Sequence, residues 1–335
     1  DLQAAEDVLA SESELDRMEK LYRKAHIQRL NQGFCSGQSG AVYIDMLSNL
    51  ERIGDHSKNI AQYILGMENR MKNRIGFIID LDGTMYRGQE MVEHADEFVA
   101  ELIRRGIPHL FLTNNSSRTP QAVAEHLRNL GIPAEAGNVY TAAQAAARYI
   151  SREKSGARVY VIGENGLLEA VNEAGLEVVE DKPDYVVQGI DRSFSYAKLA
   201  EAVRHIRSGA VYIQTNPDVL LPSDGGFMPG AGSIGAAIQT AAGRPPIVIG
   251  KPSAIIMRDA IELLGLAPDQ VWVIGDNVLT DIKAGEAAGC RTALVLTGLA
   301  TRANLAEALE AAGVVPDLVC DDLPGLLERL LAHTA

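Results

Sequence analysis

The chain has 335 residues and a mass of 36.0 kDa, which predicts about two domains on the prior of ~100 to 200 residues per domain. Its apolar fraction of 47% and its charged fraction of 22% are ordinary for a globular protein and exclude disordered and fibrous classes. The net charge of -13 disfavours nucleic acid and anionic membranes as partners, so an anionic ligand must be held by a local cluster of donors.

We expect a cytoplasmic protein without membrane insertion. No apolar run approaches the ~18 residues that a membrane span needs, and the first residues do not combine a charged stretch with an apolar one. The three cysteines, Cys35, Cys290 and Cys320, form no metal-binding pair, and their odd number cannot make a closed disulfide set. They are expected to be reduced thiols.

Residues 1–72 predict an all-α helical hairpin. They contain no strand-like run, and apolar residues recur at steps of three and four in two stretches separated by a turn at residues 31–40. The recurring residues are Leu15, Met18, Tyr22 and Ala25 in the first stretch and Met46, Leu50, Ile53, Ile60 and Ile64 in the second. A change in composition near Asn73 marks a domain boundary.

From residue 74 onward, short apolar runs alternate with amphipathic stretches, the pattern of a parallel β-sheet with crossover helices. Four runs lead directly into a polar or glycine-containing cluster, and they lie at residues 75–79, 109–112, 247–249 and 271–274. Because ligands bind at the carboxyl ends of strands in an open α/β sheet, we expect the four clusters to converge.

An insert lies between the second and third runs and has its own strands and helix. Strands are predicted at 158–162 and 185–187, and a helix near 196–207. We therefore assign residues 155–245 to a second α/β domain. We assign residues 74–154 and 246–335 to the core domain that this insert interrupts.

The residue types of the four clusters fit attack by a carboxylate on a phosphate ester. The clusters read DLDGTMY from Asp80, TNNS from Thr113, GKPS from Gly250 and GDN from Gly275, followed by Asp281. A phosphomonoester is nearly dianionic, so an anionic nucleophile needs its repulsion cancelled before it can approach. Carboxylates that hold Mg2+ would cancel part of this repulsion, and a lysine with hydroxyl and amide donors would hold the remaining phosphate oxygens.

The order DLDGT, TNN, GKPS and GDNVLTD resembles the four signature motifs of the haloacid dehalogenase superfamily. The closest likeness is to its NagD-like and p-nitrophenyl-phosphatase-like branch, in which a large α/β cap lies between the second and third motifs. The insert occupies that place, and the segments that begin at Gly189, Thr215 and Pro229 look like cap sequences of the same branch. The resemblance implies a Rossmann-like parallel-sheet core with an inserted α/β cap, which the helical hairpin precedes.

The resemblance also implies a Mg2+-dependent phosphatase with an aspartyl-phosphate intermediate, and it gives the matching residues their roles. Asp80 is the nucleophile and a metal ligand, Asp82 is the acid and base with its carbonyl on the metal, and Asp276 is a further metal ligand. Thr113, Asn114 and Lys251 bind the phosphate, Asp281 orients the lysine and the metal site, and Asn216 in the cap loop meets the leaving group. We expect small phosphorylated metabolites as substrates, namely sugar, nucleotide or aryl phosphates, and none of these is singled out.

Simpler interpretations exist for several of these residues. A lone aspartate at a strand end usually caps a helix or makes a turn, and Asp281 alone fits a charge at a helix N-terminus. The stretch from Gly230 to Gly235 spells the dinucleotide fingerprint G-x-G-x-x-G. A proline rather than a strand precedes it, and no acidic residue lies near position 250, so we interpret it as a tight turn that starts a helix.

Two pairs of carboxylates stand four residues apart in the hairpin: Glu12 with Asp16, and Glu51 with Asp55. Like charges at this spacing repel unless a positive group lies between them. With the stretch 49–60, these pairs resemble the PhoU family of phosphate-uptake regulators, over residues 5–65 and therefore over part of a bundle whose E-x-x-x-D motifs are metal sites. Solvated helix faces are the alternative to metal binding.

Three accounts of the hairpin stay open: a truncated longer protein, a gene fusion, or a hairpin that self-associates through its apolar stripes into a homodimer. The alternative function for the whole chain is a phosphate-signalling adaptor that acts through this segment.

Overall fold

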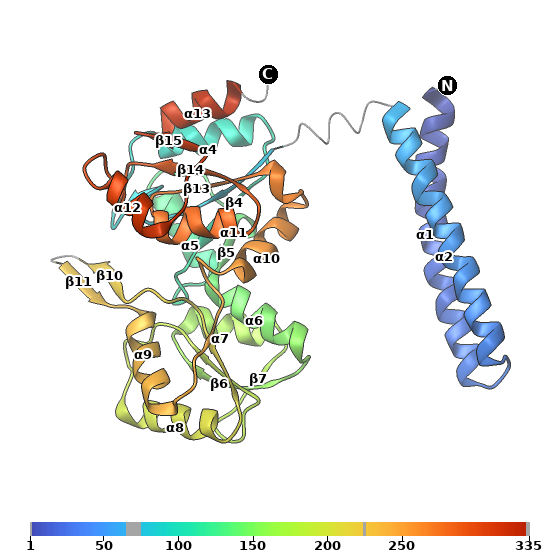
Figure 1. Cartoon of the computed structure of the whole chain (residues 1–335), viewed down its shortest axis with the longest axis horizontal. Coiled ribbons are helices and arrows are strands. Elements are labelled where there is room, and N and C mark those ends of the chain that lie inside the picture. The colour runs from blue at the N-terminus through green and yellow to red at the C-terminus, as the bar shows by residue number, and fades with distance from the viewer. Residues whose placement is uncertain (1, 65–74, 224–225, 333–335) are drawn as a thin grey trace. The chain divides into compact units, whose positions relative to one another are not determined.

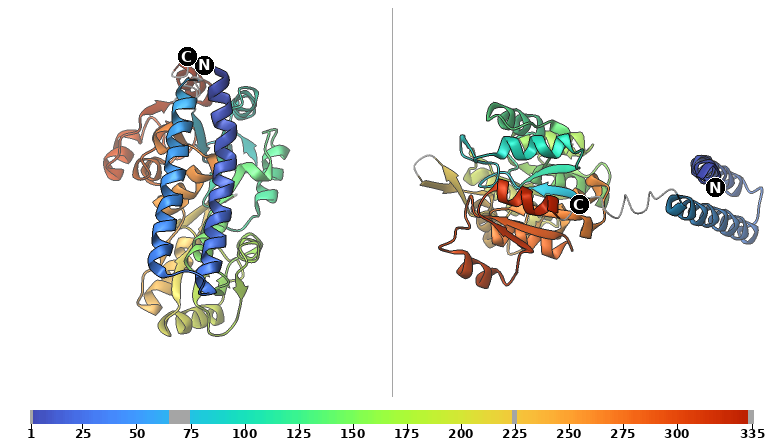
Figure 2. Two further views of the ribbon diagram at one scale, coloured as in Figure 1. Left: turned by 90° about the vertical axis from the view of Figure 1, so that its right-hand side faces the viewer. Right: turned by 90° about the horizontal axis from the view of Figure 1, so that it is seen from above.

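The structure is a computed structural model that describes residues 2–64, 75–223 and 226–332. By its internal contacts the chain divides into two units, Asp1–Arg74 and Ile75–Ala335. The predicted architecture is confirmed, with an all-helical segment followed by a parallel core sheet and a separate second sheet (Figures 1 and 2).

The first unit pairs α1 (Leu2–Asn31) with α2 (Gly37–Ile64), as predicted. Among its described residues, the apolar side chains buried between the helices are Ala5, Leu47 and Ala61. Most of the periodic apolar residues point elsewhere, because Met18, Tyr22, Met46, Leu50, Ile53 and Ile60 are all exposed. Leu15 is half-buried and lies against Gly54 of α2. The hairpin therefore buries little of its own apolar surface.

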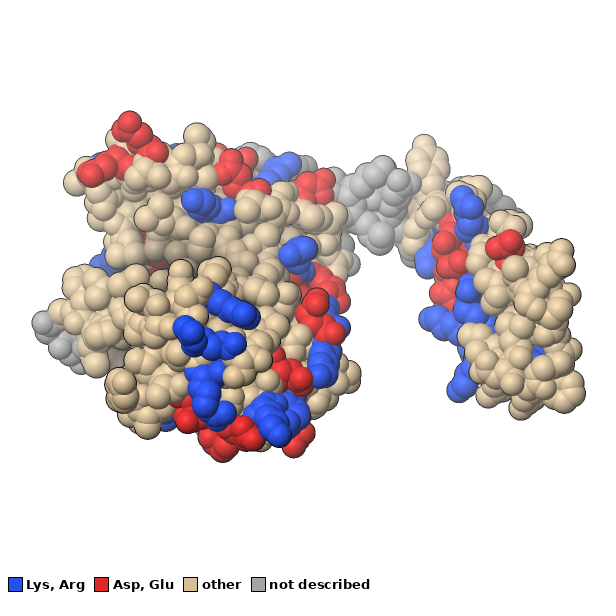
Figure 3. Space-filling model, turned by 60° about the horizontal axis from the view of Figure 1, so that its bottom comes forward, with Lys and Arg blue, Asp and Glu red and all other residues tan. Residues whose placement is uncertain are grey.

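A lysine supplies the positive charge that the predicted carboxylate pairs require. The Nζ of Lys58 donates to Oε1 of the buried Glu12 at 2.7 Å. This hydrogen bond raises the pKa of Lys58, and the charges of Asp16 and Asp55 add to the effect. Figure 3 shows that charged side chains gather along one side of the hairpin and leave another side uncharged.

The second unit is built on a parallel sheet whose strand order, over the described residues, is β15-β14-β13-β1-β4-β5. Its strands are β1 (Gly76–Ile79), β4 (His109–Thr113), β5 (Val139–Thr141), β13 (Val271–Gly275), β14 (Arg291–Val295) and β15 (Leu318–Cys320). The sequence of β1 is continuously apolar and buried, as expected for a central strand covered on both faces. It pairs with β13 and β4, so the carboxyl ends of these three strands lie together.

Helices cover both faces of this sheet. One face packs on α4 (Ala95–Arg104), α5 (Pro120–Asn129) and α13 (Leu323–Ala332). The other packs on α6 (Ala142–Glu153), α10 (Ala254–Leu264) and α11 (Lys283–Ala287). The remaining elements of this part are β2 (Tyr86–Arg87), β3 (Glu90–Met91), α12 (Leu305–Ala312), the 3-10 turns Ala136–Asn138 and Pro268–Gln270, and the π-helical segment Val278–Ile282.

The inserted part has its own parallel sheet, in the order β12-β9-β8-β6-β7 over the described residues. Its elements are β6 (Arg158–Ile162), α7 (Asn165–Glu173), β7 (Glu177–Val178), β8 (Tyr185–Gln188), α8 (Tyr196–Arg207), β9 (Val211–Gln214), α9 (Ala231–Ala242) and β12 (Ile247–Val248). A separate antiparallel ribbon joins β10 (Leu220–Ser223) to β11 (Gly226–Pro229). One apolar cluster contains Ile78 and Leu112 of the core sheet together with Val159 and Val187 of the inserted sheet, so the two parts share a hydrophobic core.

The prediction for residues 247–249 was wrong in one respect. These residues were expected to form a strand of the core sheet, but β12 pairs with β9, with Ile247 opposite Ile213. The chain leaves α9 inside the inserted part, and the free edge of β9 is the edge that this short strand meets. Lys251 still reaches the core because Gly250 turns the chain while its N–H donates to the carbonyl of Thr215.

None of the helices in the described ranges is both long and apolar enough to cross a bilayer. The three cysteines are free, as predicted.

Candidate active site

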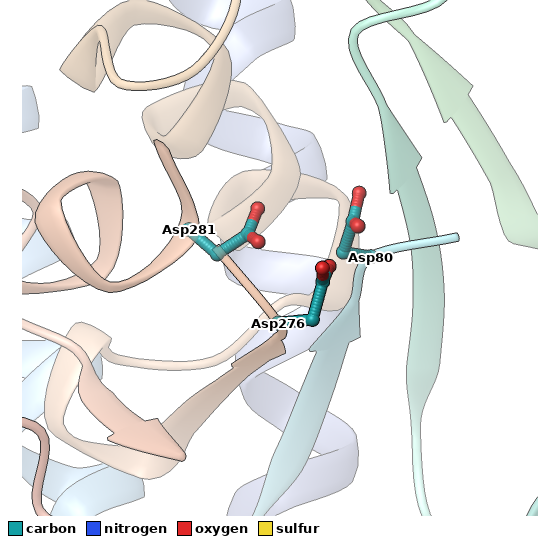
Figure 4. A group of neighbouring side chains, drawn as sticks. All are labelled: Asp80, Asp276 and Asp281. Carbon is teal, nitrogen blue, oxygen red and sulfur yellow. The ribbon is translucent and has the colours of Figure 1, made fainter. Parts of the chain in front are cut away.

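Three carboxylates meet at the carboxyl ends of two neighbouring strands of the core sheet. Asp80 follows β1, Asp276 follows β13, and Asp281 lies in the π-helical segment, as Figure 4 shows. Each offers an oxygen atom, and these oxygens lie within 4.8 Å of one another. The expected convergence of the clusters around Asp80 and Asp276 is therefore confirmed.

The ammonium group of Lys251 lies between two of these carboxylates. Its Nζ donates to Oδ1 of Asp80 at 2.5 Å and to Oδ1 of Asp281 at 2.7 Å. The lysine side chain is only 4% exposed, so its charge is balanced by these two partners rather than by water. The other oxygen of Asp281 accepts from the backbone N–H of Asn277, which leaves this carboxylate fully engaged.

The pKa shifts of the carboxylates at this centre reflect burial first and the neighbouring negative charges second. Burial and the nearby Asp281 charge raise the pKa of Asp80 well above its ordinary value, although Lys251 opposes them. Burial raises the pKa of Asp276 to about 6, and Asp281 adds to this effect. Burial alone would lower the pKa of Lys251, but Asp281 and Asp80 outweigh it and raise that pKa. A cation beside Asp80 and Asp276 would relieve both carboxylates.

Asp82 lies two residues beyond Asp80, and although part of the residue is exposed, protein atoms surround its carboxyl group. The loss of water around it raises its pKa, while the positive charges of Lys251 and Arg118 partly oppose the shift. Its Oδ2 accepts a long hydrogen bond of 3.5 Å from the hydroxyl of Tyr86. A raised pKa keeps a larger fraction of this carboxyl group protonated near neutral pH, which suits a proton donor.

Glycines make room for the carboxylates. A Cβ atom added to Gly298 or to Gly83 would overlap the carboxylate of Asp276, and one added to Gly275 would overlap that of Asp281. Gly83 also has a φ of +90°, which side-chain-bearing residues rarely adopt. The backbone N–H of Leu299 donates to Oδ2 of Asp276 at 2.6 Å, so the Gly298 turn holds this carboxylate as well as admitting it.

The second cluster lies beside the lysine. The Nζ of Lys251 is 3.4 Å from the carbonyl oxygen of Leu112, next to Thr113. The hydroxyl of Thr113 is buried and accepts from the backbone N–H of Asn115 at 3.1 Å. The side chain of Asn114 contacts the backbone of Lys251 through two hydrogen bonds, one donated and one accepted. Thr113 and Asn114 thus lie close to Lys251, and their contact with a phosphate stays a prediction.

Asn216 joins the cap loop to this cluster. Its Nδ2 donates to the carbonyl of Asn114 at 2.7 Å, and its Oδ1 accepts from the backbone N–H of Asp218. Its side chain is buried, with both polar atoms engaged. The predicted contact of Asn216 with a leaving group stays a prediction, and the bonds that the side chain makes are those of a link between loops.

Some residues that lie at the site were not predicted from the sequence to be site residues. Asp218 accepts from Nδ2 of Asn114 at 3.1 Å, and the hydroxyl of Thr84 donates to Asp276 at 3.3 Å. The sequence segment from Thr215 to Asp218 was noted as cap-like, but only the folded loop brings Asp218 to Asn114. Gly298 carried no signal in the sequence, because it lies 17 residues beyond Asp281, the last of the motif residues, and only the fold brings it to Asp276.

The donor set fits a hard divalent cation. Asp80 and Asp276 present carboxylate oxygens close together in a buried place, where burial and, after it, the nearby carboxylates raise both pKa values. Oxygen ligands of this kind are those that Mg2+ prefers. Asp281 is already engaged by Lys251 and Asn277, so it is better suited to orienting the lysine than to binding metal.

Family comparisons agree with the order of the motifs. A family described as haloacid dehalogenase-like hydrolase matches residues 77–177, and one described as HAD-hydrolase-like matches residues 248–326. The PhoU domain family matches residues 1–64.

Curated relatives cover most of the second unit. The chain is 46% identical over 240 residues to the 5'-nucleotidase YutF of Bacillus subtilis strain 168, a match that spans 72% of this chain and 94% of that protein. It is 45% identical over 238 residues to the acid sugar phosphatase of Staphylococcus haemolyticus, which covers 71% of this chain and 90% of that protein.

Solved structures show the same likeness. The p-nitrophenyl phosphatase from Archaeoglobus fulgidus matches with a TM-score of 0.73 and 39% identity, over 76% of this chain and 99% of that one. NagD from Escherichia coli K-12 matches with a TM-score of 0.69 and 31% identity, over 75% of this chain and 97% of that one. The glycerol phosphate phosphatase Rv1692 from Mycobacterium tuberculosis, in complex with magnesium, matches with a TM-score of 0.71 and 36% identity, over 76% of each chain.

Proposed function

The chain belongs to the haloacid dehalogenase-like hydrolases and is a phosphatase of that family, and from this premise we propose that it hydrolyses small phosphomonoesters with Mg2+ through an aspartyl-phosphate intermediate. The observation that supports the mechanism most strongly is the position of Lys251 between Asp80 and Asp281, with Asp276 alongside. A nucleophile, a phosphate-binding cation and a metal-binding carboxylate are then available at one place.

The reaction has two steps, both centred on phosphorus. In the first, a carboxylate oxygen of Asp80 bonds to phosphorus, the bond from phosphorus to the ester oxygen breaks, and Asp82 gives its proton to that oxygen. In the second, water loses a proton to Asp82 and its oxygen bonds to phosphorus while the bond from phosphorus to the Asp80 oxygen breaks. This releases inorganic phosphate and restores the carboxylate of Asp80.

The remaining residues bind and orient. Asp80, Asp276 and the carbonyl of Asp82 would hold Mg2+, which when bound reduces the repulsion between the phosphate dianion and the nucleophile. Lys251 binds a phosphate oxygen and stays charged, because its pKa is raised. Thr113 and backbone N–H groups near Asn114 bind the other oxygens, and Asp281 keeps the lysine in place.

The proposed substrates are small phosphorylated metabolites. The matched relatives carry the names 5'-nucleotidase, acid sugar phosphatase and p-nitrophenyl phosphatase, and all of these act on small esters. The cap shares an apolar cluster with the core and is tied to it by hydrogen bonds at Asn114 and Ser116, which favours compact leaving groups over macromolecules. We place this activity in the cytoplasm.

Replacement of the nucleophile tests the proposal. We expect Asp80→Asn to lower kcat for p-nitrophenyl phosphate by at least ~1,000-fold, because an amide cannot form the intermediate. The exposed Asp269→Asn serves as a matched control and should retain wild-type activity. Steady-state rates with Mg2+ and with EDTA complete the measurement. Turnover retained by Asp80→Asn, or wild-type rates in EDTA, would contradict the mechanism.

We further propose that the hairpin pairs with a second copy. Val42, Met46, Ile53 and Ile60 recur at helical spacing on one side of α2 and are 58%, 58%, 62% and 61% exposed. Two helices that are each ~42 Å long and lie about 10 Å apart present a face of ~800 Å². This is about the area that each partner buries in a stable interface. Sedimentation of the full chain with Ile53→Glu should show a smaller mass than with Ile27→Glu, an exposed apolar control off this stripe. Equal masses for both variants and the wild type would count against pairing.

A further inference from the structure

The loop from Thr215 to Asp218 in the cap is hydrogen-bonded to the loop that follows β4, and two of these bonds are made by Asn114. The carbonyl of Asn114 accepts from Nδ2 of Asn216 at 2.7 Å, and Nδ2 of Asn114 donates to Oδ2 of Asp218 at 3.1 Å. Nearby, the hydroxyl of Thr215 donates to that of Ser116 at 3.2 Å. Both ends of the cap loop are thus bonded to the loop that follows β4.

Both polar atoms of the Asn114 side-chain amide make hydrogen bonds. Its Oδ1 accepts from the backbone N–H of Lys251 at 2.8 Å, and its Nδ2 donates to the carbonyl of Lys251 at 3.0 Å as well as to Asp218. One amide N–H goes to each acceptor. An ionised carboxylate has no proton to donate, so the Nδ2 of Asn114 is the end of the amide that faces Asp218. The Oδ1 of Asn114 is thereby directed to the backbone N–H of Lys251.

This amide holds the backbone of the residue whose side chain reaches the nucleophile. The other end of Lys251 lies 2.5 Å from Asp80, at the end of a buried side chain. Gly250 must lack a side chain here, because a Cβ would overlap Oδ1 of Asn114 and the carbonyl of Thr215. A shift of Asn114 would therefore move the start of the lysine side chain.

Asp218 is itself held firmly. The backbone N–H of Gly232 donates to its carbonyl at 2.8 Å, and a Cβ at Gly230 or Gly232 would overlap the backbone of Pro217 or Asp218. These are glycines of the stretch that spells a dinucleotide fingerprint. In this fold they let the start of α9 pack closely on the cap loop.

We propose that Asp218 is a positioning residue for the phosphatase reaction, through which the cap fixes Asn114 and so the phosphate-binding Lys251. The inference rests on the proposed function of Lys251, and it assigns the cap a part in the chemical step beyond covering the substrate. A residue that acts in this way affects every substrate equally, since all share the phosphate group. A residue that contacts the leaving group affects substrates unequally.

The test compares the full chain with Asp218→Ala, Asp218→Asn and the control Val219→Ala, whose side chain is 60% exposed. Hydrolysis of p-nitrophenyl phosphate and of glycerol phosphate is measured with Mg2+, together with inhibition by inorganic phosphate. We expect Asp218→Ala to lower kcat/KM by ~10 to 100-fold. The factor should be the same for both substrates, and phosphate inhibition should weaken. Asp218→Asn keeps an acceptor oxygen for Asn114 and should recover most of the activity.

A double-mutant cycle with Asn114→Ala adds a second criterion. Once Asn114 is removed, loss of Asp218 should have little further effect, because the two side chains act in series. Independent and additive losses would overturn the inference. So would unchanged kinetics in Asp218→Ala, equal losses in Asp218→Ala and Asp218→Asn, or a factor that differs strongly between the two substrates. The turnover of both substrates by the wild type tests the proposed function separately. If the wild type hydrolyses neither substrate, the proposed function fails, whereas the variants test the positioning role of Asp218.

Discussion

Lys251 and Asp281 form an ion pair in which Nζ and Oδ1 are 2.7 Å apart and both side chains are nearly removed from water, with exposures of 4% and 1%. Asp281 is anchored in turn by the N–H of Asn277. The pair holds the ammonium group against Asp80, the proposed nucleophile.

Removing the charge of Asp281 tests this relationship. We expect Asp281→Asn to reduce kcat by ~10 to 100-fold, because the lysine loses a partner that orients it. The free energy of unfolding should fall by roughly 1 to 3 kcal/mol, the cost of a weakened buried hydrogen bond to a charged group. Kinetics and urea unfolding measure the two effects, with Asp269→Asn as the control. A variant with normal kinetics would show that Asp80 alone positions the lysine.

The proton-donor role of Asp82 predicts a dependence on the leaving group. Asp82→Asn should slow hydrolysis of glycerol phosphate by ~100 to 10,000-fold, because an alkoxide needs a proton as it departs. Hydrolysis of p-nitrophenyl phosphate should be affected less in its first step, since p-nitrophenolate is a stable anion. Single-turnover rates of p-nitrophenolate release separate this step from the attack of water. Equal losses in the first step for both esters would refute the assignment.

The turn at Gly298 should be intolerant of a methyl group. A Cβ at this position would overlap the Asp276 carboxylate, so Gly298→Ala must displace it. We expect the Mg2+ concentration for half-maximal activity to rise at least ~10-fold. Gly137→Ala is the matched control, because an added Cβ there meets nothing within 4 Å. An unchanged Mg2+ requirement in Gly298→Ala would argue against Asp276 as a metal ligand.

The raised pKa of Asp276 predicts how stability depends on pH without divalent cations. Its pKa is about 6 in the folded chain and near 3.8 when unfolded, so the folded state binds the proton more tightly. The contribution of Asp276 to stability is present below about pH 4 and is lost as the pH rises through about 6. The loss is on the order of 3 kcal/mol.

Unfolding in EDTA between pH 4 and 7 measures this loss. Relative to wild type, Asp276→Asn should become more stable as the pH rises, and Mg2+ should stabilise the wild type at pH 7. A constant difference between the two proteins across this range would contradict the shift.

The buried Glu12 of the hairpin predicts a requirement for Lys58. Lys58→Met should lower the stability of the first unit by roughly 1 to 3 kcal/mol, because Glu12 then lacks its hydrogen-bond partner. Lys24→Met, at an exposed position of α1, is the control. Helical circular dichroism during thermal unfolding of the full chain reports the change. Glu12→Gln added to Lys58→Met should restore stability in part, and no effect of Lys58→Met would mean that Glu12 is satisfied by water.

The motif residues and the class of fold could be predicted because their signals are local. Asp80 and Asp276 each follow a short apolar run, and strand ends of a parallel sheet meet at one edge. The hairpin was equally readable from its helical periodicity. The structure adds that the periodic residues of α2, such as Met46 and Ile53, face outward rather than toward α1.

What could not be predicted depends on contacts between distant segments. Residues 247–249 have the composition of a buried strand. Composition alone does not show which of the two sheets has a free edge with which this strand can pair. Gly298 and Asp218 gain their roles only when the chain brings them to Asp276 and Asn114. The G-x-G-x-x-G stretch shows the reverse case, a recognisable pattern whose glycines serve close packing on Pro217 and Asp218.

The pairing of β12 with β9 bears on how such enzymes can be recombined. A chimera made by exchanging inserts at residues 155 and 245 would separate Ile247 from its neighbour Ile213 and leave Gly250 against a foreign Thr215 equivalent. A graft that travels as one block from Arg158 through Ser253 keeps the donor's own lysine with the loop that anchors it. Swapped modules of this kind should then preserve the contact between the cap loop and the turn that carries the lysine.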